Sequence, residues 1–172
     1  SSDVCSSDLI DESKVKNLAH HIMSQLGVED AALSIHLVGA AAMRGLNKAH
    51  RGKDRATDVL SFPQEEWQNP AKVKARRRAA ARQRSKRDAP PRPLGDIVIA
   101  PDVAARNAKA IGQPLDREIC FLLVHGLLHL TGHDHERKAD ERLMLRAQRQ
   151  LMRGFDAAHG QRLWRGCVRM RR

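Results

Sequence analysis

The spacing of apolar residues predicts helices and strands that alternate along most of the chain. Between Asp11 and Leu26, apolar residues recur at i, i+3, i+4, i+7, i+8 and i+11, which is the spacing of one helix face. Gly27 follows and suits the end of that helix. Similar patterns predict helices over residues 40–49, 101–110, 115–130 and 138–152, and strands over residues 33–37, 58–62 and 94–100.

Two of these predicted helices should meet the core in different ways. In the helix over 115–130, apolar residues occur nearly all round, so this helix should lie buried at the centre of the fold. The helix over 138–152 should turn a single face inward, which carries Leu143, Ala147 and Leu151.

The mixture of strands and helices within 172 residues indicates one domain of the α/β (α+β) class. We expect a small mixed β-sheet with about five helices, and a domain that spans residues 10–155. Residues 1–9 and 160–172 are interpreted as tails that are either foreign to the native protein or disordered. The chain has no apolar run of about 18 residues, so the sequence predicts no transmembrane helix.

The excess positive charge is concentrated in two segments. The formal net charge is +11, yet residues 71–93 hold ten basic residues and one acidic residue. Residues 160–172 hold five basic residues and no acidic one, so the rest of the chain is slightly acidic. Segment 71–93 lacks an apolar periodicity, which predicts a basic loop insertion. A solvated insertion and an RNA contact both stay open for this loop.

The number and spacing of the cysteines indicate the redox compartment of the protein. Cys5, Cys120 and Cys167 are widely spaced and odd in number, which suits neither a disulfide framework nor a thiolate zinc site. This usage is typical of a reducing compartment, and we therefore expect a cytoplasmic protein.

The central helix carries the strongest chemical signal, in the stretch HGLLHLTGHDH. His125 and His129 are four positions apart, so their imidazoles leave one helical face. Gly132 can end the helix and let the chain fold back, so that His135 supplies a third imidazole. Three such ligands leave a fourth position for water, as in a catalytic zinc site. We predict one Zn²⁺ per chain at these three histidines.

Two details of this stretch bear on the site. His133 competes as the third ligand only if the helix continues through Gly132, and we prefer His135. Zinc peptidases with this histidine spacing place a general-base Glu directly after the first His, whereas this chain has Gly126. A metallopeptidase would therefore lack its base, and a phosphodiester is the more suitable target.

A second group of polar residues lies between a predicted helix and a predicted strand. Arg51, Lys53 and Arg55 are expected in a loop, where functional residues tend to gather. An arginine can form paired hydrogen bonds with a phosphate and stabilise developing charge. An ordinary solvated loop is the alternative interpretation.

Three motifs together resemble the YbeY family of bacterial endoribonucleases: LNKAHRGKDRATDVLSFP, LGDIVIA and HGLLHLTGHDH. The resemblance implies one α/β domain that binds zinc through His125, His129 and His135, with a functionally important arginine at Arg51. It also implies a zinc-dependent, single-strand-specific endoribonuclease. The activity would serve 16S rRNA 3′-end maturation and ribosome quality control.

The same resemblance implies partners and roles for single residues. The partners would be ribosomal RNA and the small ribosomal subunit, with its proteins and a ribosome-associated GTPase as further candidates, and no membrane. Arg51 and His125 would be catalytic, and His133 is a candidate proton shuttle at a position where relatives usually have Tyr. Apart from the resemblance, their positive charge makes Lys53, Arg55, Arg76, Arg77 and Arg78 candidate RNA contacts.

Two other functions stay open beside the nuclease. One is a ribosome-assembly factor that binds RNA and whose zinc is structural, which a fourth protein ligand would support. The other is a metallopeptidase, which Gly126 disfavours.

Overall fold

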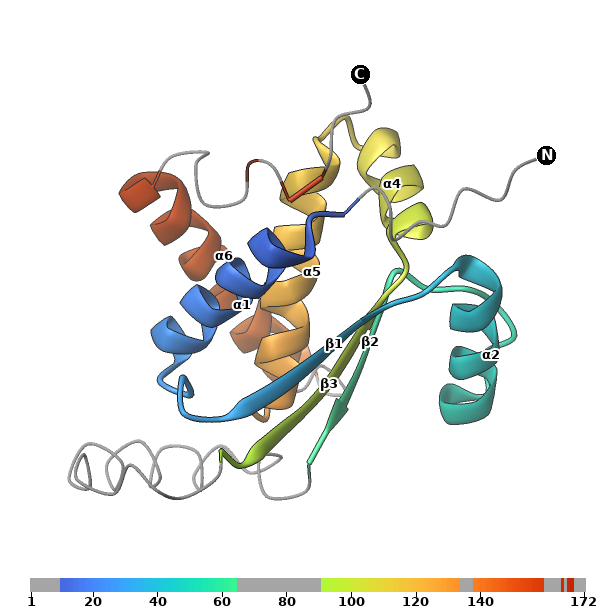
Figure 1. Ribbon diagram of the computed structural model, residues 1–172, viewed down its shortest axis with the longest axis horizontal. Helices are drawn as coiled ribbons and strands as arrows, with labels where there is room; N and C mark the ends of the chain where they lie inside the picture. The colour runs from blue at the N-terminus through green and yellow to red at the C-terminus, as the bar shows by residue number, and fades with distance from the viewer. Residues whose placement is uncertain (1–9, 65–90, 134–137, 160–164, 166, 169–172) are drawn as a thin grey trace.

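The computed structural model describes residues 10–64, 91–133, 138–159, 165, 167 and 168. All the helices and strands predicted from the sequence are present (Figure 1). In chain order the elements are α1 (Glu12–Leu26), β1 (Ala32–Leu37), α2 (Ala40–Arg51), β2 (Val59–Pro63), β3 (Pro93–Ile99), α4 (Pro101–Ala110), α5 (Leu115–Leu130) and α6 (Lys138–His159).

The three strands form one mixed sheet in the order β1, β3, β2. β1 pairs in parallel with β3, with Ile35 opposite Ile97, and β2 pairs antiparallel with β3, with Ser61 opposite the same residue. The small mixed sheet and the α+β class predicted from the sequence are therefore confirmed.

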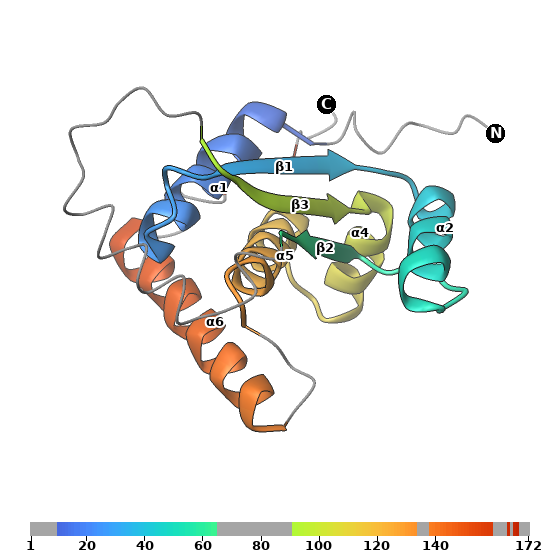
Figure 2. The same ribbon diagram turned by 90° about the horizontal axis from the view of Figure 1, so that it is seen from below.

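Different helices cover the two faces of this sheet. Ile97 and Ile99 of β3 belong to the large core that α1 and α5 share. Val98 belongs to a smaller core with Met43 of α2 and Leu60 of β2. The division follows from the strand, because successive side chains point to opposite faces. Figures 1 and 2 both show α2 standing apart from α5, which lies at the centre of the fold as predicted.

Capping residues explain where α1 begins and where α1 and α5 end. The Asp11 carboxylate accepts hydrogen bonds from the backbone N–H groups of Ser13 and Lys14 at 3.1 and 3.3 Å, which caps the start of α1. Gly27 ends α1 with a φ of 68°, as its position in the sequence predicts. Gly132 has a φ of 88° and turns the chain directly after α5, which confirms the predicted helix end.

The inward face predicted for α6 is wrong by about one residue. Leu143 was expected to face inward but is 60% exposed, while Ala147 and Leu151 are only half-buried. Neighbouring helix residues are about 100° apart, so a shift of one residue brings another stripe to the core. The polar Gln148 interrupts that stripe and hides it in the sequence. The buried residues of α6 are Met144, Gln148, Met152 and Phe155.

A short part of the expected C-terminal tail belongs to the core. Cys167 is fully buried, and its carbonyl oxygen accepts a hydrogen bond from the Asp11 N–H at 2.7 Å. Val168 forms an antiparallel bridge with Ile10. Burial raises the pKa of the Cys167 thiol to about 11, which keeps it protonated and unreactive. These two residues therefore pack against the start of the domain, whereas residues 1–9, 160–164, 166 and 169–172 lie outside the described residues.

The predicted basic insertion at 71–93 falls between β2 and β3 in the chain. Its residues up to 90 lie outside the described residues, and Pro93 already belongs to β3. Within the described part of the chain, no helix combines the length and apolar character needed to cross a membrane.

Candidate metal centre

His125 and His129 lie on α5 with their rings facing each other. Their Nε2 atoms are 3.1 Å apart, their ring centroids are 4.7 Å apart, and the ring planes meet at 77°. This closeness follows from the four-residue spacing, because side chains at i and i+4 lie one above the other on a helix. The structure thus brings together the two imidazoles that the sequence predicts on one helical face.

The other ring nitrogen of each histidine lies near an oxygen atom. Nδ1 of His125 is 3.5 Å from Oε1 of Gln148 on α6, and Nδ1 of His129 is 3.1 Å from the main-chain oxygen of His133. In the tautomer in which each Nδ1 donates its proton to these oxygens, each Nε2 would offer its lone pair to a metal ion.

The Gln148 side chain is held in place by its surroundings. It is only 2% exposed, and its amide nitrogen donates a hydrogen bond to the main-chain oxygen of Phe121 at 3.3 Å. That bond fixes which end of the amide faces His125, since the nitrogen points to a carbonyl and the oxygen remains for the imidazole. Gln148 therefore orients His125 from the neighbouring helix, a role that the sequence analysis missed.

The two histidines fit a single zinc ion. Nitrogen ligands bind zinc at about 2.0–2.1 Å in a tetrahedral arrangement, which places two such nitrogens about 3.3–3.4 Å apart. The observed separation of the Nε2 atoms, 3.1 Å, is close to that value. The predicted third ligand, His135, lies outside the described residues. Among the residues that are described, no group of three or more His, Cys, Asp or Glu side chains could hold a metal ion.

The position that follows the first histidine has little room for a side chain. A Cβ atom added to Gly126 would lie 2.8 Å from Cδ1 of Ile97 and 3.1 Å from Oγ of Ser61. Ile97 is itself fully buried, so β2 and β3 pass close to α5 at this point. A glutamate at this position, as zinc peptidases have, would collide with the sheet.

His133 contributes to the site through its backbone. A ligand role for His133 required the helix to continue through Gly132. α5 instead ends at Leu130. Its main-chain oxygen lies next to His129, and its Nδ1 lies 3.2 Å from the main-chain oxygen of Leu128. Burial lowers the pKa of the His133 imidazole, while the contact with the Leu128 carbonyl acts in the opposite direction.

Arg51 is not in a loop, as the sequence suggested, but is the last residue of α2. Gly52 ends the helix directly after it with a φ of 66°, so the helical pattern continues two residues past its predicted end. Lys53 and Arg55 do lie in the following loop, and both are exposed like Arg51. Arg76, Arg77 and Arg78 lie outside the described residues.

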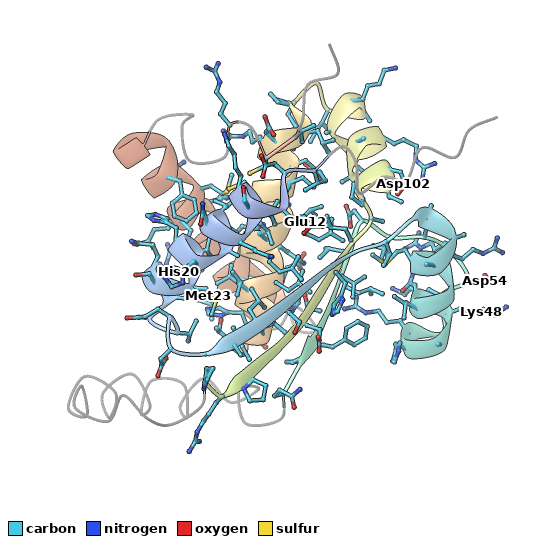
Figure 3. The ribbon with its side chains drawn as sticks, in the orientation of Figure 1. Glu12, His20, Met23, Lys48, Asp54 and Asp102 are labelled. Atoms are coloured by element: carbon cyan, nitrogen blue, oxygen red, sulfur yellow. The ribbon has the colours of Figure 1, made fainter. Side chains whose placement is uncertain are left out.

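A small polar network holds that loop against α2. Asp54 pairs with Arg44 at 2.6 Å and with Lys48 at 3.1 Å, and Figure 3 labels Lys48 and Asp54 at this edge of the molecule. The hydrogen bond from Arg44 lowers the pKa of the Asp54 carboxyl. The buried Asn47 donates a hydrogen bond to the main-chain oxygen of Arg55 at 2.7 Å. The loop therefore has a defined shape that presents its cations to solvent.

Arg51 and the two histidines lie on different sides of β2. The ring of His50, next to Arg51, meets the ring of Phe62 edge-on at 4.8 Å. Ser61, the adjacent residue of β2, lies close to Gly126 on α5. Because adjacent strand residues point to opposite faces, α2 and α5 flank β2 from opposite sides. The structure thus places Arg51 across the edge strand β2 from the histidines.

An aromatic side chain lies beside the histidine pair. The ring of Phe121 stacks nearly parallel to that of His125, with centroids 6.4 Å apart and planes at 17°. Phe121 is 38% exposed, so a nucleic-acid base can reach the same ring. The chain has no Tyr, three Phe and two Trp, so its composition alone points to no base-stacking platform. The only sign in the sequence is that a Phe precedes His125 by one helical turn.

One buried carboxyl group lies on the same helix as the histidines. Glu118 is 5% exposed and accepts a hydrogen bond from the side-chain amide of Gln113. Burial raises the pKa of Glu118, and the charge of Asp58 adds to this effect. Glu118 precedes His125 by two helical turns, about 10 Å along the axis, so it lies too far away to serve the histidine pair directly.

Comparison with known proteins agrees with the three motifs. The family model described as Endoribonuclease YbeY matches residues 3–156. A relative of that name from Frankia casuarinae is 38% identical over 150 residues, which cover 87% of this chain and 70% of the relative. Another from Limosilactobacillus reuteri is 38% identical over 142 residues, with 82% and 85% covered. A third from Myxococcus xanthus is 42% identical over 134 residues, which cover 78% of this chain but only 40% of the relative.

A solved structure shares the fold. The solution structure of TM1509 from Thermotoga maritima aligns with a TM-score of 0.55 and 24% sequence identity, over 88% of this chain and 80% of that one. This likeness supports the α+β architecture, while the sequence relatives and the family model establish the family. The chain belongs to the Endoribonuclease YbeY family.

Proposed function

We propose that this protein is a zinc-dependent endoribonuclease specific for single-stranded RNA. The observation that carries the proposal is the pair of Nε2 atoms, 3.1 Å apart, on two histidines whose Nδ1 atoms both face oxygen acceptors. Such a pair supplies two of the three ligands of an open zinc site, and His135 is proposed as the third. Membership of a family of endoribonucleases supports RNA as the substrate.

The residues around the histidines have distinct tasks in this proposal. Zinc, when bound, supplies a Lewis acid that activates water or a phosphate oxygen. Gln148 and the His133 carbonyl hold the protons on Nδ1 of the two histidines, so that both Nε2 atoms stay available as ligands. Phe121 offers a ring on which an unpaired base can stack. Arg51 contributes a cation that can bind a phosphate of the RNA from beyond β2, and His133 stays a candidate proton shuttle.

The biological setting is also proposed. We infer a cytoplasmic role in 16S rRNA 3′-end maturation and ribosome quality control. The partners would be ribosomal RNA and the small ribosomal subunit, with its proteins and a ribosome-associated GTPase as further candidates. Lys53, Arg55, Arg76, Arg77 and Arg78 are the proposed RNA contacts, of which the first two lie exposed in the loop after α2.

Metal analysis joined to a cleavage assay tests the proposal. The purified protein should contain one zinc ion per chain, cleave single-stranded RNA, lose this activity on chelation and regain it when zinc is restored. Duplex RNA of the same sequence should resist cleavage. A protein that binds zinc and RNA without cutting would support an assembly factor. Cleavage of casein under the same conditions would revive the peptidase, against which the crowded Gly126 position argues.

Changing Arg51 to Glu should lower RNA cleavage by about 10- to 150-fold, because a charge-assisted hydrogen bond contributes about 1.5–3 kcal/mol. Zinc content should not change, because Arg51 lies across β2 from the histidines. Cleavage rates and bound zinc are measured on the same preparation. Arg106→Glu on α4, which makes the same charge change at an exposed site, is the control. Equal losses in both variants would contradict a specific role for Arg51.

Changing Gln148 to Leu should weaken zinc binding by about 10- to 100-fold, as losses of second-layer partners of metal ligands generally do. The side chain is buried and reaches His125 from α6, so its loss frees the imidazole to rotate or change tautomer. Zinc affinity is measured by competition with a chromophoric chelator. Gln150→Leu is the matched control on the exposed side of the same helix, and Gln148→Glu should restore affinity. An unchanged affinity in Gln148→Leu would rule out the orienting role.

A further inference from the structure

Four arginines form a single line along the exposed side of α6. Arg142, Arg146, Arg149 and Arg153 follow one another at steps of four, three and four residues, which keeps them on one helical face. All four are exposed. The line covers about 16 Å along the helix axis. Leu143 and Gln150 lie beside the arginines and are exposed with them.

Most of the positive charge of this arginine face is not balanced within the helix, because only Arg153 has an acidic residue, Asp156, three or four positions away. Arg142, Arg146 and Arg149 have no acidic residue three or four positions away in the sequence. In the part of the chain that the structure describes, the ion pairs involve β1, β3, α2 and the loop after it, and none reaches α6. Like charges at these spacings destabilise a helix by about 0.2–0.5 kcal/mol per pair. A face that carries this cost suits an anionic partner.

The sequence hides this face when charge is counted by segment. Acidic residues elsewhere between 94 and 159 bring the net charge of that stretch to zero. The arginines come together only when α6 forms and its buried residues fix which side faces outward. Met144, Gln148 and Met152 pack toward α5 and so turn the arginine face to solvent. Figure 2 shows α6 at the side of the molecule, where a long partner can lie along it.

The helix that carries the arginine face also contacts the candidate metal centre. Gln148 reaches His125 from the buried side of α6, between Arg146 and Arg149 in the sequence. A polyanion that lies along the arginines is therefore held at a fixed position relative to the histidines. The Leu143 side chain, 60% exposed beside the arginines, adds apolar surface that suits unstacked bases.

We propose that the arginine face of α6 binds the phosphate backbone of single-stranded RNA beyond the point of cleavage. This inference rests on the proposed nuclease function. Guanidinium groups form paired hydrogen bonds with phosphate oxygens, and a line of them matches a chain of phosphates better than it matches a single anion. Its contribution is to position a long substrate, so it should affect long RNA far more than short RNA.

The test removes the charge of the face and follows the salt dependence of RNA binding. Each phosphate contact to single-stranded nucleic acid contributes about 0.7 to the slope of log affinity against log salt. Changing all four arginines to Gln should therefore lower the slope for a single-stranded 2′-O-methyl RNA by about 2.8. Two double variants, R142Q/R146Q and R149Q/R153Q, should each lower it by about 1.4. Glutamine keeps a good helix propensity, and circular dichroism checks the fold.

The control removes the same charge elsewhere. Lys14, Lys16, Arg106 and Lys109 are exposed on α1 and α4, and their change to Gln should alter the slope by less than about 0.7. A slope that is unchanged in the face variants, or lowered equally in the control, would overturn the proposal. Poly-glutamate is a second probe: if the face variants lost affinity for it but kept the RNA slope, the partner would be an acidic protein instead.

Failure of this inference can be separated from failure of the proposed function. The face variants should keep full zinc content and should cleave a short single-stranded RNA at the wild-type rate, while KM for a long RNA rises. A wild-type protein that neither binds zinc nor cleaves RNA would refute the nuclease itself. A wild-type nuclease with an unchanged salt slope in the face variants would refute only the role of the arginine face.

Discussion

Replacing His125 with alanine is expected to remove zinc from the protein and to lower RNA cleavage by about 1,000-fold or more. Loss of a residue that only orients a ligand generally costs about 10- to 100-fold in metal affinity or activity, so loss of a ligand should cost more. The variant removes the His125 imidazole, whose Nε2 atom lies 3.1 Å from Nε2 of His129. The measurements are zinc per chain after dialysis and the rate of single-stranded RNA cleavage.

The matched control for this variant is His20→Ala. His20 is exposed on α1, where Figure 3 labels it, and its replacement should leave both zinc content and cleavage unchanged. A His125→Ala protein that kept its zinc and cut RNA at the wild-type rate would refute the proposed site. A variant that lost zinc and also lost its cooperative unfolding would indicate a metal that mainly stabilises the fold.

Replacing Gly95 with alanine is expected to lower the free energy of unfolding by about 3 kcal/mol or more. Gly95 has a φ of 141°, which only glycine adopts readily. An added Cβ would overlap the backbone oxygen of Phe62 and would lie 2.9 Å from Cδ2 of Leu130. A backbone atom cannot yield as a flexible side chain can, so the pairing of β2 with β3 has to shift.

Urea unfolding of the Gly95→Ala protein measures this loss, and Gly45→Ala is its control. Gly45 lies within α2, and a Cβ added there would have no atom within 4 Å outside its own helix. That change should stabilise the protein by up to about 1 kcal/mol, because alanine favours a helix. Equal midpoints for Gly95→Ala and the wild type would show that β2 and β3 can separate at no cost.

The sequence predicted the elements well because each has a local signal. The apolar spacing of α1, the alternation in β1 and the left-handed glycines that follow helices all depend on neighbours in the chain. The inward face of α6 depends instead on which stripe meets α5. Two helical faces, one beginning at Leu143 and one at Met144, could each pack on α5. The face that does pack contains the polar Gln148, so its pattern in the sequence looks less apolar than it is buried.

The residues of the candidate site also fall into those that the sequence could predict and those that it could not. His125 and His129 could be found from their spacing, because a helix alone brings them together. Gln148 could not, since its role needs α6 to pack on α5 and to bring residues 23 positions apart within hydrogen-bonding distance. The turn at Gly132 was predicted, but not that it places the His133 carbonyl next to His129. Contacts between distant segments require the packed fold.

The contact between Gln148 and His125 also makes metal binding and helix docking mutually dependent. Because the same hydrogen bond orients the imidazole and attaches α6 to α5, any free energy that favours one favours the other. Zinc at the histidines would therefore hold α6, and with it the arginine face, more firmly in place. By the same reciprocity, RNA bound along α6 would raise the affinity of the histidines for zinc.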